Sequence, residues 1–306
     1  MLKIFFRRII ILFPLLFVVA SITFFLMSLI PGDPTDLLLG EFATQNERIE
    51  LRRALGLNDS LWTQYFSFVW GLLRLDLGVS LLSGQSVTAL IAERFPATLE
   101  LTVFSIFLSC LWGIPAGVFT AATKSKSIDF FSTSIGVLGM SIPGYFLGPM
   151  LIWLFAIVFG ILPVGGRGDF SHVVLPSLSL ALPLGAILMR ITRASIQETL
   201  TQEFIKVAYS KGLNQFTLYF KHALRASLIP IITVVGLQVG TLLTGTVITE
   251  TIFNWPGLGT LLFEAIQQRD YPIVQACILI IAFIYVFINF LTDMIYSFAN
   301  PRIRTQ

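Results

Sequence analysis

Charged residues are scarce in this sequence: they make up only 12% of its 306 residues, whereas 55% are hydrophobic. A soluble domain carries about 25% charged residues, so this chain has too few to cover a soluble fold of its size. A disordered chain is also excluded, because disorder needs low hydrophobicity and high charge. The composition therefore predicts a polytopic membrane protein.

Cysteine and histidine are also scarce, which limits the available chemistry. The two cysteines, Cys110 and Cys277, lie inside apolar runs without CxxC or CxxH neighbours, so we expect neither a disulfide scaffold nor a zinc site. The two histidines, His172 and His222, belong to no H-E-x-x-H motif, and no G-x-S-x-G occurs. We therefore expect no catalytic residues, no metal and no cofactor, and we do not interpret the chain as an enzyme.

Two further absences concern the energy source. No G-x-x-x-x-G-K-S/T sequence occurs, so the chain has no P-loop of its own for ATP. Paired carboxylates within a span are missing too: Glu100, Glu250 and Asp293 lie near the ends of predicted spans, where an acid costs less than at the midplane. An ion-coupled secondary transporter more often needs ionisable groups in mid-membrane and is kept as a remote alternative.

Long apolar runs are abundant instead. A spanning helix needs about 20 apolar residues, and the chain offers six such runs. We interpret the first as a retained span because a signal peptide has an apolar core of only about 7–15 residues, and this run ends in Pro31-Gly32-Asp33-Pro34 rather than in a cleavage site. The predicted spans are residues 9–30, 98–120, 130–154 or a little beyond, 175–191, 228–249 and 273–298.

Basic residues predict the orientation of these spans. With the N-terminus inside, the two short outer loops hold only Arg167 and Arg269. Cytoplasmic loops carry the excess of Lys and Arg, and long loops escape this rule, so both termini are expected in the cytoplasm. The net charge of +3 thus reflects topology and does not indicate nucleic acid as a partner. The inner basic residues are Lys3, Arg7, Arg8, Lys124, Lys126, Arg190, Arg193, Lys206, Lys211, Lys221, Arg225, Arg302 and Arg304.

The segment after the first span, residues 31–97, is polar and acidic. Within it, residues 46–57 have the pattern of a short helix that stops at Gly56. We interpret the segment as an extracytoplasmic extension with some structure of its own.

The segment between the fourth and fifth spans, loop 195–227, is polar yet periodic. Leu200, Phe204, Val207 and Ala208 fall on one face of a short helix, and Gly212 is placed to end that helix as a C-terminal cap. A second amphipathic run follows, with Phe216, Tyr219, Phe220 and Ala223 on one side. Two interpretations remain open for this helix–glycine–helix unit: an interfacial helix resting on membrane lipid, or a docking element seated in a groove of a soluble partner.

These residues also carry a family resemblance. Loop 195–227 and the start of the fifth span resemble the cytoplasmic motif of binding-protein-dependent ABC importer permeases, and more narrowly the dipeptide/oligopeptide branch. Further matches occur in order along almost the whole chain. The matching stretches are residues 203–213, 221–225 and 228–233 around the loop, and residues 29–34, 55–57, 64–65, 76–80, 94–99, 253–259 and 301–304 elsewhere.

The resemblance implies an all-α polytopic membrane protein with six transmembrane helices, the type I permease fold of ABC importers and cytoplasmic termini. It implies a location in the bacterial cytoplasmic (inner) membrane and an assembly with a second, homologous permease, two ATP-binding subunits and an extracytoplasmic solute-binding protein. The missing P-loop agrees with this division of labour. The expected substrates are dipeptides or oligopeptides, with glutathione, nickel chelates or sugars as alternatives in the same importer class.

The resemblance also assigns roles to parts of the chain. Residues 1–97 form the first span and the outer extension, residues 98–298 the permease core with its coupling loop 195–227, and residues 299–306 a cytoplasmic tail. The outer extension is expected to receive the solute-binding protein, the alternative being a cap over the outer mouth. Residues expected to couple to the ATPase are Glu203, Ala208, Lys211, Gly212, Leu213, His222 and Pro230, and those expected in extracytoplasmic docking are Asn46, Glu47, Glu50 and Arg53.

Overall fold

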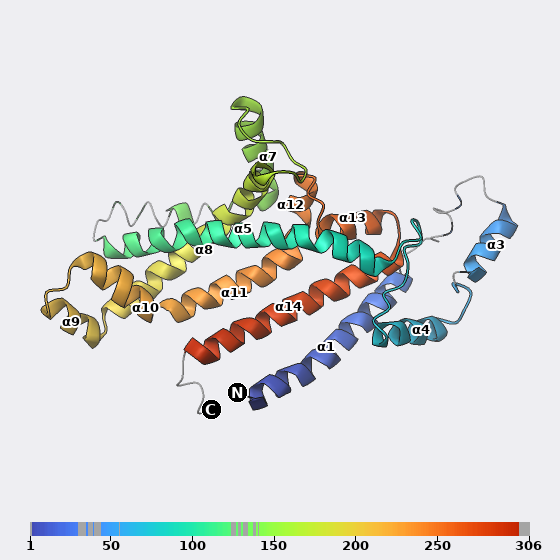
Figure 1. Ribbon diagram of the computed structural model, residues 1–306, viewed down its shortest axis with the longest axis horizontal. Coiled ribbons are helices and arrows are strands. Elements are labelled where there is room, and N and C mark those ends of the chain that lie inside the picture. The colour runs from blue at the N-terminus through green and yellow to red at the C-terminus, as the bar shows by residue number, and fades with distance from the viewer. Residues whose placement is uncertain are drawn as a thin grey trace. The chain divides into compact units, whose positions relative to one another are not determined.

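The computed structural model of the chain is built from helices (Figure 1). In the part of the chain that it describes, the one β-type pairing is an isolated bridge between Val79 and Ser86. The described residues are 2–29, 35, 39, 44–54, 56–123, 127, 130, 134–136, 139 and 141–299. The motif at residues 30–34, Lys124, Lys126 and the tail at residues 300–306 lie outside them.

The helices follow one another along the chain with short connections. Two segments, η1 and η2, have the wider π-helical winding. The elements are α1 (Leu2–Leu29), α3 (Gln45–Ala54), α4 (Leu61–Leu73), α5 (Val87–Ala122), α7 (Gly144–Leu151), η1 (Ile152–Val158), α8 (Phe170–Leu200), α9 (Glu203–Ser210), η2 (Thr217–Ala223), α10 (Leu224–Ala226), α11 (Leu228–Gly245), α12 (Val247–Ile252), α13 (Leu258–Gln267) and α14 (Tyr271–Ala299).

Among the described residues, four helices are long and apolar enough to cross a membrane. They are Leu12–Leu29 of α1, the whole of α5 and α8, and Tyr271–Thr292 of α14. A fifth is added if Thr217–Ala226 and Leu228–Leu243, which meet at a bend of 64°, count as one broken span. The predicted all-helical membrane fold is therefore confirmed, and these helices coincide with the first, second, fourth, fifth and sixth predicted spans.

The third predicted span, residues 130–154 or a little beyond, lies partly outside the described residues, and its described part is interrupted. The chain leaves the helical conformation at Ile142 and Pro143, and Pro143 is the extended residue that precedes α7. Proline lacks a backbone N–H and disfavours a helical residue before it, so the helix restarts at Gly144. The apolar helix then continues past residue 154, through η1 to Val158.

Two compact units make up the structure. The core unit comprises the described residues of Leu99–Trp255 and Phe287–Gln306, and the N-terminal unit comprises those of Leu2–Thr98 and Pro256–Val286. Each has its own buried clusters of apolar side chains.

Close approach of helix backbones characterises the core unit. A Cβ added at Gly185 of α8 would collide with the indole of Trp112 on α5, and one added at Gly113 would lie 2.5 Å from the Gly185 carbonyl oxygen. Small residues permit such approach in membrane helices, where packing rather than the hydrophobic effect drives association. The Trp112 indole N–H donates to the Ala181 carbonyl at 3.3 Å, and the Gln238 amide of α11 donates to the Leu184 carbonyl at 3.1 Å. Helices α5 and α11 are therefore both fixed to α8.

In the N-terminal unit, the start of α5 packs against α13 and α14. Val87 and Ile91 are buried in a cluster with Leu258 and Leu261 of α13 and Val274 of α14. The helix that contains the second predicted span, residues 98–120, begins earlier, at Val87. Burial of this first part of α5 explains why the helix extends beyond the apolar stretch.

A buried carboxylate connects two segments of the N-terminal unit. Asp270, just before α14, is 1% exposed, and its Oδ2 atom accepts a hydrogen bond from the Ser80 hydroxyl at 2.6 Å. Its Oδ1 atom is buried without a hydrogen-bond partner. Ser80 also pairs with Gln85 through its backbone N–H at 2.8 Å, so this contact attaches the turn of residues 80–86 to the start of α14.

Candidate functional site

Helix α9, in the middle of loop 195–227, is the centre of the candidate site and lies beyond the end of α8 (Figure 1). The helix ends where the sequence predicts. The Lys211 N–H donates to the Val207 carbonyl at 3.1 Å and the Gly212 N–H to the Tyr209 carbonyl at 3.0 Å. Gly212 then takes φ +79°, the left-handed conformation in which a side chain is strained, so the chain reverses direction there.

One face of α9 is buried against the rest of the core unit. Ile205 is 4% exposed, and Ala208 is buried beside it. Both belong to a cluster that contains Val118 of α5 and Ile196 of α8, together with Leu218 and Ala223 of η2. An eight-residue helix is not stable alone in water, so these contacts hold α9 in shape and attach it to two spans.

The other positions of α9 are exposed. Glu203, Lys206 and Ser210 lie opposite the buried stripe, and three large side chains lie between them and that stripe. Phe204, Val207 and Tyr209 are 44%, 54% and 66% exposed. The face predicted to hold Leu200, Phe204, Val207 and Ala208 is therefore divided by the structure, because Ala208 is buried and Phe204 and Val207 are not. The small side chain of Ala208 lets α9 approach its own chain rather than forming part of an outward surface.

The second half of the loop begins with a capped turn. The Asn214 side-chain oxygen accepts a hydrogen bond from the Thr217 N–H at 2.7 Å. The winding then widens into η2, where the Leu224 N–H reaches the Tyr219 carbonyl. Such π-helical turns are rare and frequently occur at functional sites. The rings of Phe216 and Phe220 stack with their centroids 4.6 Å apart.

A buried pair of hydroxyls joins the two ends of the loop. The Thr199 and Ser227 side chains are hydrogen-bonded at 2.8 Å, and the Ser227 hydroxyl also contacts the Ser195 carbonyl at 3.1 Å. The end of α8 and the start of α11 are thereby held together at the base of the loop. Sequence reasoning missed this contact and Ile205; the three-residue spacing of Ile205 and Ala208 is the signal that could have found the latter.

The structure places the other predicted coupling residues on and near this site. Glu203, Lys211 and Gly212 are exposed on α9 or at its end, and Glu203 lies in the first turn, where a negative charge is favourable. Leu213 and His222 are half-buried, and Leu213 packs against the α9 cluster. Pro230, in the first turn of α11, is exposed.

The predicted docking residues lie together on α3, a helix without buried residues. Asn46, Glu47, Glu50 and Arg53 are all exposed. Glu47 caps its own helix: its carboxylate accepts hydrogen bonds from the Thr44 N–H at 2.8 Å and the Thr44 hydroxyl at 2.9 Å. These bonds hold the pKa of the Glu47 carboxyl below its usual value. Glu47 therefore has a structural role of its own. Asn46, Glu50 and Arg53 are exposed and are therefore accessible to a partner.

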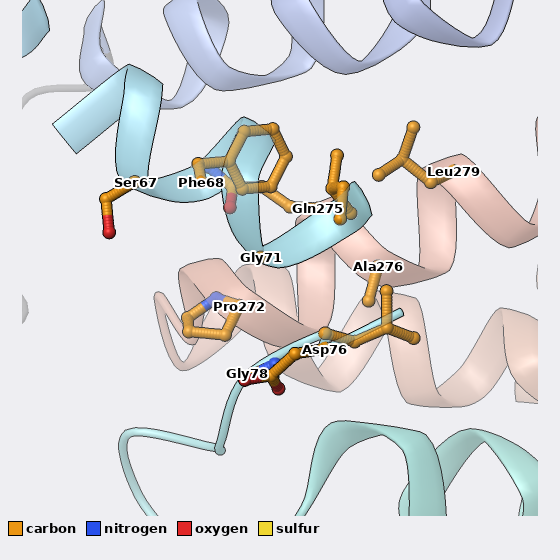
Figure 2. Close-up of a pocket in the computed structure, with 11 residues that line it drawn as sticks. Ser67, Phe68, Gly71, Asp76, Gly78, Pro272, Gln275, Ala276 and Leu279 are labelled. Atoms are coloured by element: carbon orange, nitrogen blue, oxygen red, sulfur yellow. The ribbon is translucent and has the colours of Figure 1, made fainter. Parts of the chain in front are cut away.

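A cavity of about 230 Å³ lies in the N-terminal unit between α4, the turn at residues 76–78 and the start of α14 (Figure 2). Ser67, Asp76 and Gln275 are the polar side chains of its lining. The apolar part includes Phe68 and Leu279, which lie in α4 and α14. Within the described residues, no cluster of three His, Cys, Asp or Glu side chains could hold a metal ion.

Comparison with known families gives the class of protein. Residues 113–305 match the family described as binding-protein-dependent transport system inner membrane component. Residues 1–102 match the family of the N-terminal part of such membrane components. The chain belongs to this family of inner membrane components, so it is a multi-pass transport permease subunit of the inner membrane and not an enzyme.

Curated relatives match over nearly their full length. The dipeptide transport system permease protein DppB of Alkalihalophilus pseudofirmus is 38% identical, over 97% of this chain and 98% of that protein. The DppB protein of Escherichia coli K12 is 37% identical over 99% of both chains. The glutathione transport system permease protein GsiC of the same strain is 37% identical over 97% of both.

Solved structures agree on the fold. A chain of the inward-facing MetNI methionine ABC transporter matches with a TM-score of 0.60 at 19% identity, over 69% of this chain and 96% of that one. A chain of an amino acid ABC transporter crystallised with histidines matches with a TM-score of 0.55 at 18% identity, over 68% and 93%. The fold is therefore that of an ABC importer permease, as the sequence resemblance implies.

Proposed function

We propose that this subunit crosses the membrane six times with both termini in the cytoplasm. The excess of basic residues in loop 195–227 over the two short outer loops, which hold only Arg167 and Arg269, supports this orientation. The third span would include residues outside the described ranges. Reporter fusions after residues 125 and 166 test it. The first should report the cytoplasm and the second the outside; cytoplasmic signal from both would refute the topology.

The permease would form half of a translocation pathway, with a second, homologous permease as the other half. Two ATP-binding subunits would supply ATP hydrolysis, because the sequence of this chain has no P-loop. An extracytoplasmic solute-binding protein would deliver the substrate, in agreement with the family's description. Co-purification of the second permease, the ATP-binding subunits and the solute-binding protein with this chain tests the assembly. Isolation of this chain as a lone functional carrier would contradict it.

Loop 195–227 would couple the ATPase to the pathway. The observation that carries this proposal is the two-sided character of α9: Ile205 and Ala208 attach it to the spans, whereas Phe204, Val207 and Tyr209 remain exposed. Amphipathic helices of this kind dock in grooves of partner proteins. Movement of the ATPase subunit against the exposed face would shift α9, and the buried cluster would transmit the shift to α5 and α8.

Replacing Gly212 tests the coupling. Gly212→Val places a β-branched residue at φ +79° and should displace the end of α9, whereas Gly212→Asn keeps a residue that tolerates this conformation. No atom lies within 4 Å of a Cβ at this position, so the strain comes from the backbone alone. We expect the valine variant to lose transport and substrate-stimulated ATP hydrolysis while the asparagine variant retains both. Full activity of Gly212→Val would refute the role of the turn.

The exposed residues of α3 would help receive the solute-binding protein. Deleting residues 46–57 should weaken the affinity of that protein for the transporter if the segment docks it. An unchanged affinity with altered substrate leakage would instead support a cap over the outer mouth. A charge-reversal variant, Glu50→Lys, separates docking from folding because Glu50 is exposed and makes no part of the helix cap at Glu47.

Dipeptides or oligopeptides are the proposed substrates, since two of the relatives are named dipeptide permeases. Glutathione is the second candidate because another relative, equally similar in sequence, is named a glutathione permease. Uptake of labelled dipeptides, longer peptides and glutathione by a deletion strain, with and without the restored gene, discriminates between them. Nickel chelates and sugars serve as further competitors in the same assay.

A further inference from the structure

Helix α4 is too short for a membrane span and too apolar for an ordinary extramembrane helix. Its thirteen residues, Leu61–Leu73, include no charged side chain. At 1.5 Å per residue the helix is about 20 Å long, less than the roughly 30 Å of a bilayer core. It therefore cannot cross the membrane, and its composition does not suit a position in water.

One side of α4 carries a row of exposed, large apolar side chains. Trp62, Phe66, Trp70 and Leu73 recur at helical spacing and are 57–71% exposed. The next side of the helix is polar, with Thr63 and Ser67 exposed to solvent. An amphipathic helix whose apolar face is rich in tryptophan is typical of the membrane interface.

The third side of α4 packs against the first span. The Tyr65 hydroxyl is hydrogen-bonded to the Ser21 hydroxyl at 2.7 Å. The rings of Phe24 and Tyr65 lie 5.4 Å apart, and those of Phe25 and Trp62 lie 6.0 Å apart. These contacts fall four to eight residues before Leu29, where α1 ends, which is about 6–12 Å inside that end of the helix. Helix α4 thus meets α1 within the length of the span.

The exposed row of α4 is continuous with the exposed surface of that span. Trp62 contacts Phe25 of α1 on one side and Phe66 on the other, with ring centroids 6.0 and 6.4 Å apart. Ile22 and Leu26, which flank Phe25 on α1, are both exposed. Exposed apolar side chains on a membrane span offer a surface for lipid, and the row on α4 extends this surface of α1.

A cation lies at one end of the row. The Arg74 guanidinium lies over the Trp70 ring, 4.9 Å from its centroid. Arginine near the end of a membrane helix directs its charge toward the interface and buries its stem. Leu75, which follows, is 86% exposed at φ +59°, another large apolar side chain held outward.

We propose that α4 is embedded in one leaflet of the bilayer without crossing it, and that the row Trp62–Phe66–Trp70–Leu73 contacts lipid. The segment between the first two spans would then be anchored in the membrane rather than free above it. Assigning α4 to the outer leaflet rests on the orientation under Proposed function. The contact with lipid does not depend on that orientation.

Spin labels on neighbouring positions of α4 test this proposal. Phe66→Cys and Trp70→Cys are labelled in the full chain, in a Cys110→Ala/Cys277→Ala background, and reconstituted into phosphatidylethanolamine/phosphatidylglycerol vesicles. Thr63→Cys and Ser67→Cys are the matched controls on the polar side. We expect several-fold higher ratios of oxygen to nickel-chelate collisions at positions 66 and 70 than at positions 63 and 67.

Two outcomes would overturn the proposal. Equal nickel accessibility at all four positions would place the row in water. Low accessibility to both reagents at positions 66 and 70 in the assembled transporter would show that a protein subunit covers the row. Neither outcome bears on coupling at Gly212, so failure here is distinguishable from failure of the proposed function. Phe66→Lys and Ser67→Lys give a second comparison: the first should lower the amount of membrane-inserted protein, and the second should not.

Discussion

Ile205 and Val207 lie two residues apart on α9 in opposite surroundings, so truncating each one separates the two roles of the helix. Ile205→Ala removes a side chain that is 4% exposed and leaves a cavity in its cluster. Truncations of this kind cost about 2–5 kcal/mol. We take the lower part of this range, about 2–3 kcal/mol, because the cluster lies at the edge of the fold and can relax. The ratio of docked to undocked α9 should then fall about 30- to 150-fold.

Hydrogen exchange on the assembled transporter measures this ratio, because amides of a locally opening segment exchange in proportion to its open population. Ile205→Ala should accelerate exchange in residues 203–210 by that factor while the ATPase subunits stay bound. Val207→Ala, a truncation on the side that is 54% exposed, should leave exchange unchanged and weaken retention of the ATPase subunits. Equal acceleration in both variants, or none in Ile205→Ala, would refute the division of α9 into an inner and an outer face.

Three further predictions follow from contacts described above. Gly185→Ala should lower the thermal unfolding midpoint because the new Cβ collides with Trp112, whereas Gly144→Ala, with nothing within 4 Å of its Cβ, should not. Asp270→Ala should lower the free energy of unfolding by about 1–3 kcal/mol and accelerate hydrogen exchange in residues 80–86. Asp270→Asn should have a smaller effect on both, because the asparagine keeps an acceptor for the Ser80 hydroxyl. Hydrogen bonds from the Ser171 side chain and then His172 lower the pKa of Asp169. The resulting stabilisation is present above the ordinary pKa of the carboxyl, about 4, and is lost as the pH falls through the lower folded value; Asp169→Asn should reduce this acid sensitivity in unfolding measurements.

The apolar runs predicted most of the spans because a bilayer demands a long uninterrupted stretch, and the chain contains few others. The prediction was less accurate where tertiary contacts decide the outcome. Helix α5 starts at Val87 because Val87 and Ile91 are buried against α13 and α14, which no local pattern reveals. The break at Pro143 is the reverse case, because the missing backbone N–H of proline is a local property that the sequence shows directly.

The candidate site shows the same limit on a smaller scale. The end of α9 at Gly212 could be predicted, since a left-handed glycine cap is a local property. The side of α9 that faces inward could not be predicted, because Leu200, Phe204 and Ile205 are all apolar. The buried side is the one that contacts Val118, which is far away in the sequence. The row on α4 was overlooked because thirteen residues are too few for a span, and polar neighbours on both sides suggested a segment in water.

The hydrogen bond between Thr199 and Ser227 makes the chain between them a segment that could be exchanged for another. Its two ends meet at 2.8 Å, so the chain between them can be replaced without changing the separation of α8 and α11. A replacement needs small or apolar residues at the buried positions, which are Ile205, Ala208, Leu218 and Ala223, and at the half-buried positions that pack against them. Under the coupling proposed above, a chimera that exchanges this one short segment should bind the ATPase subunit of the donor transporter.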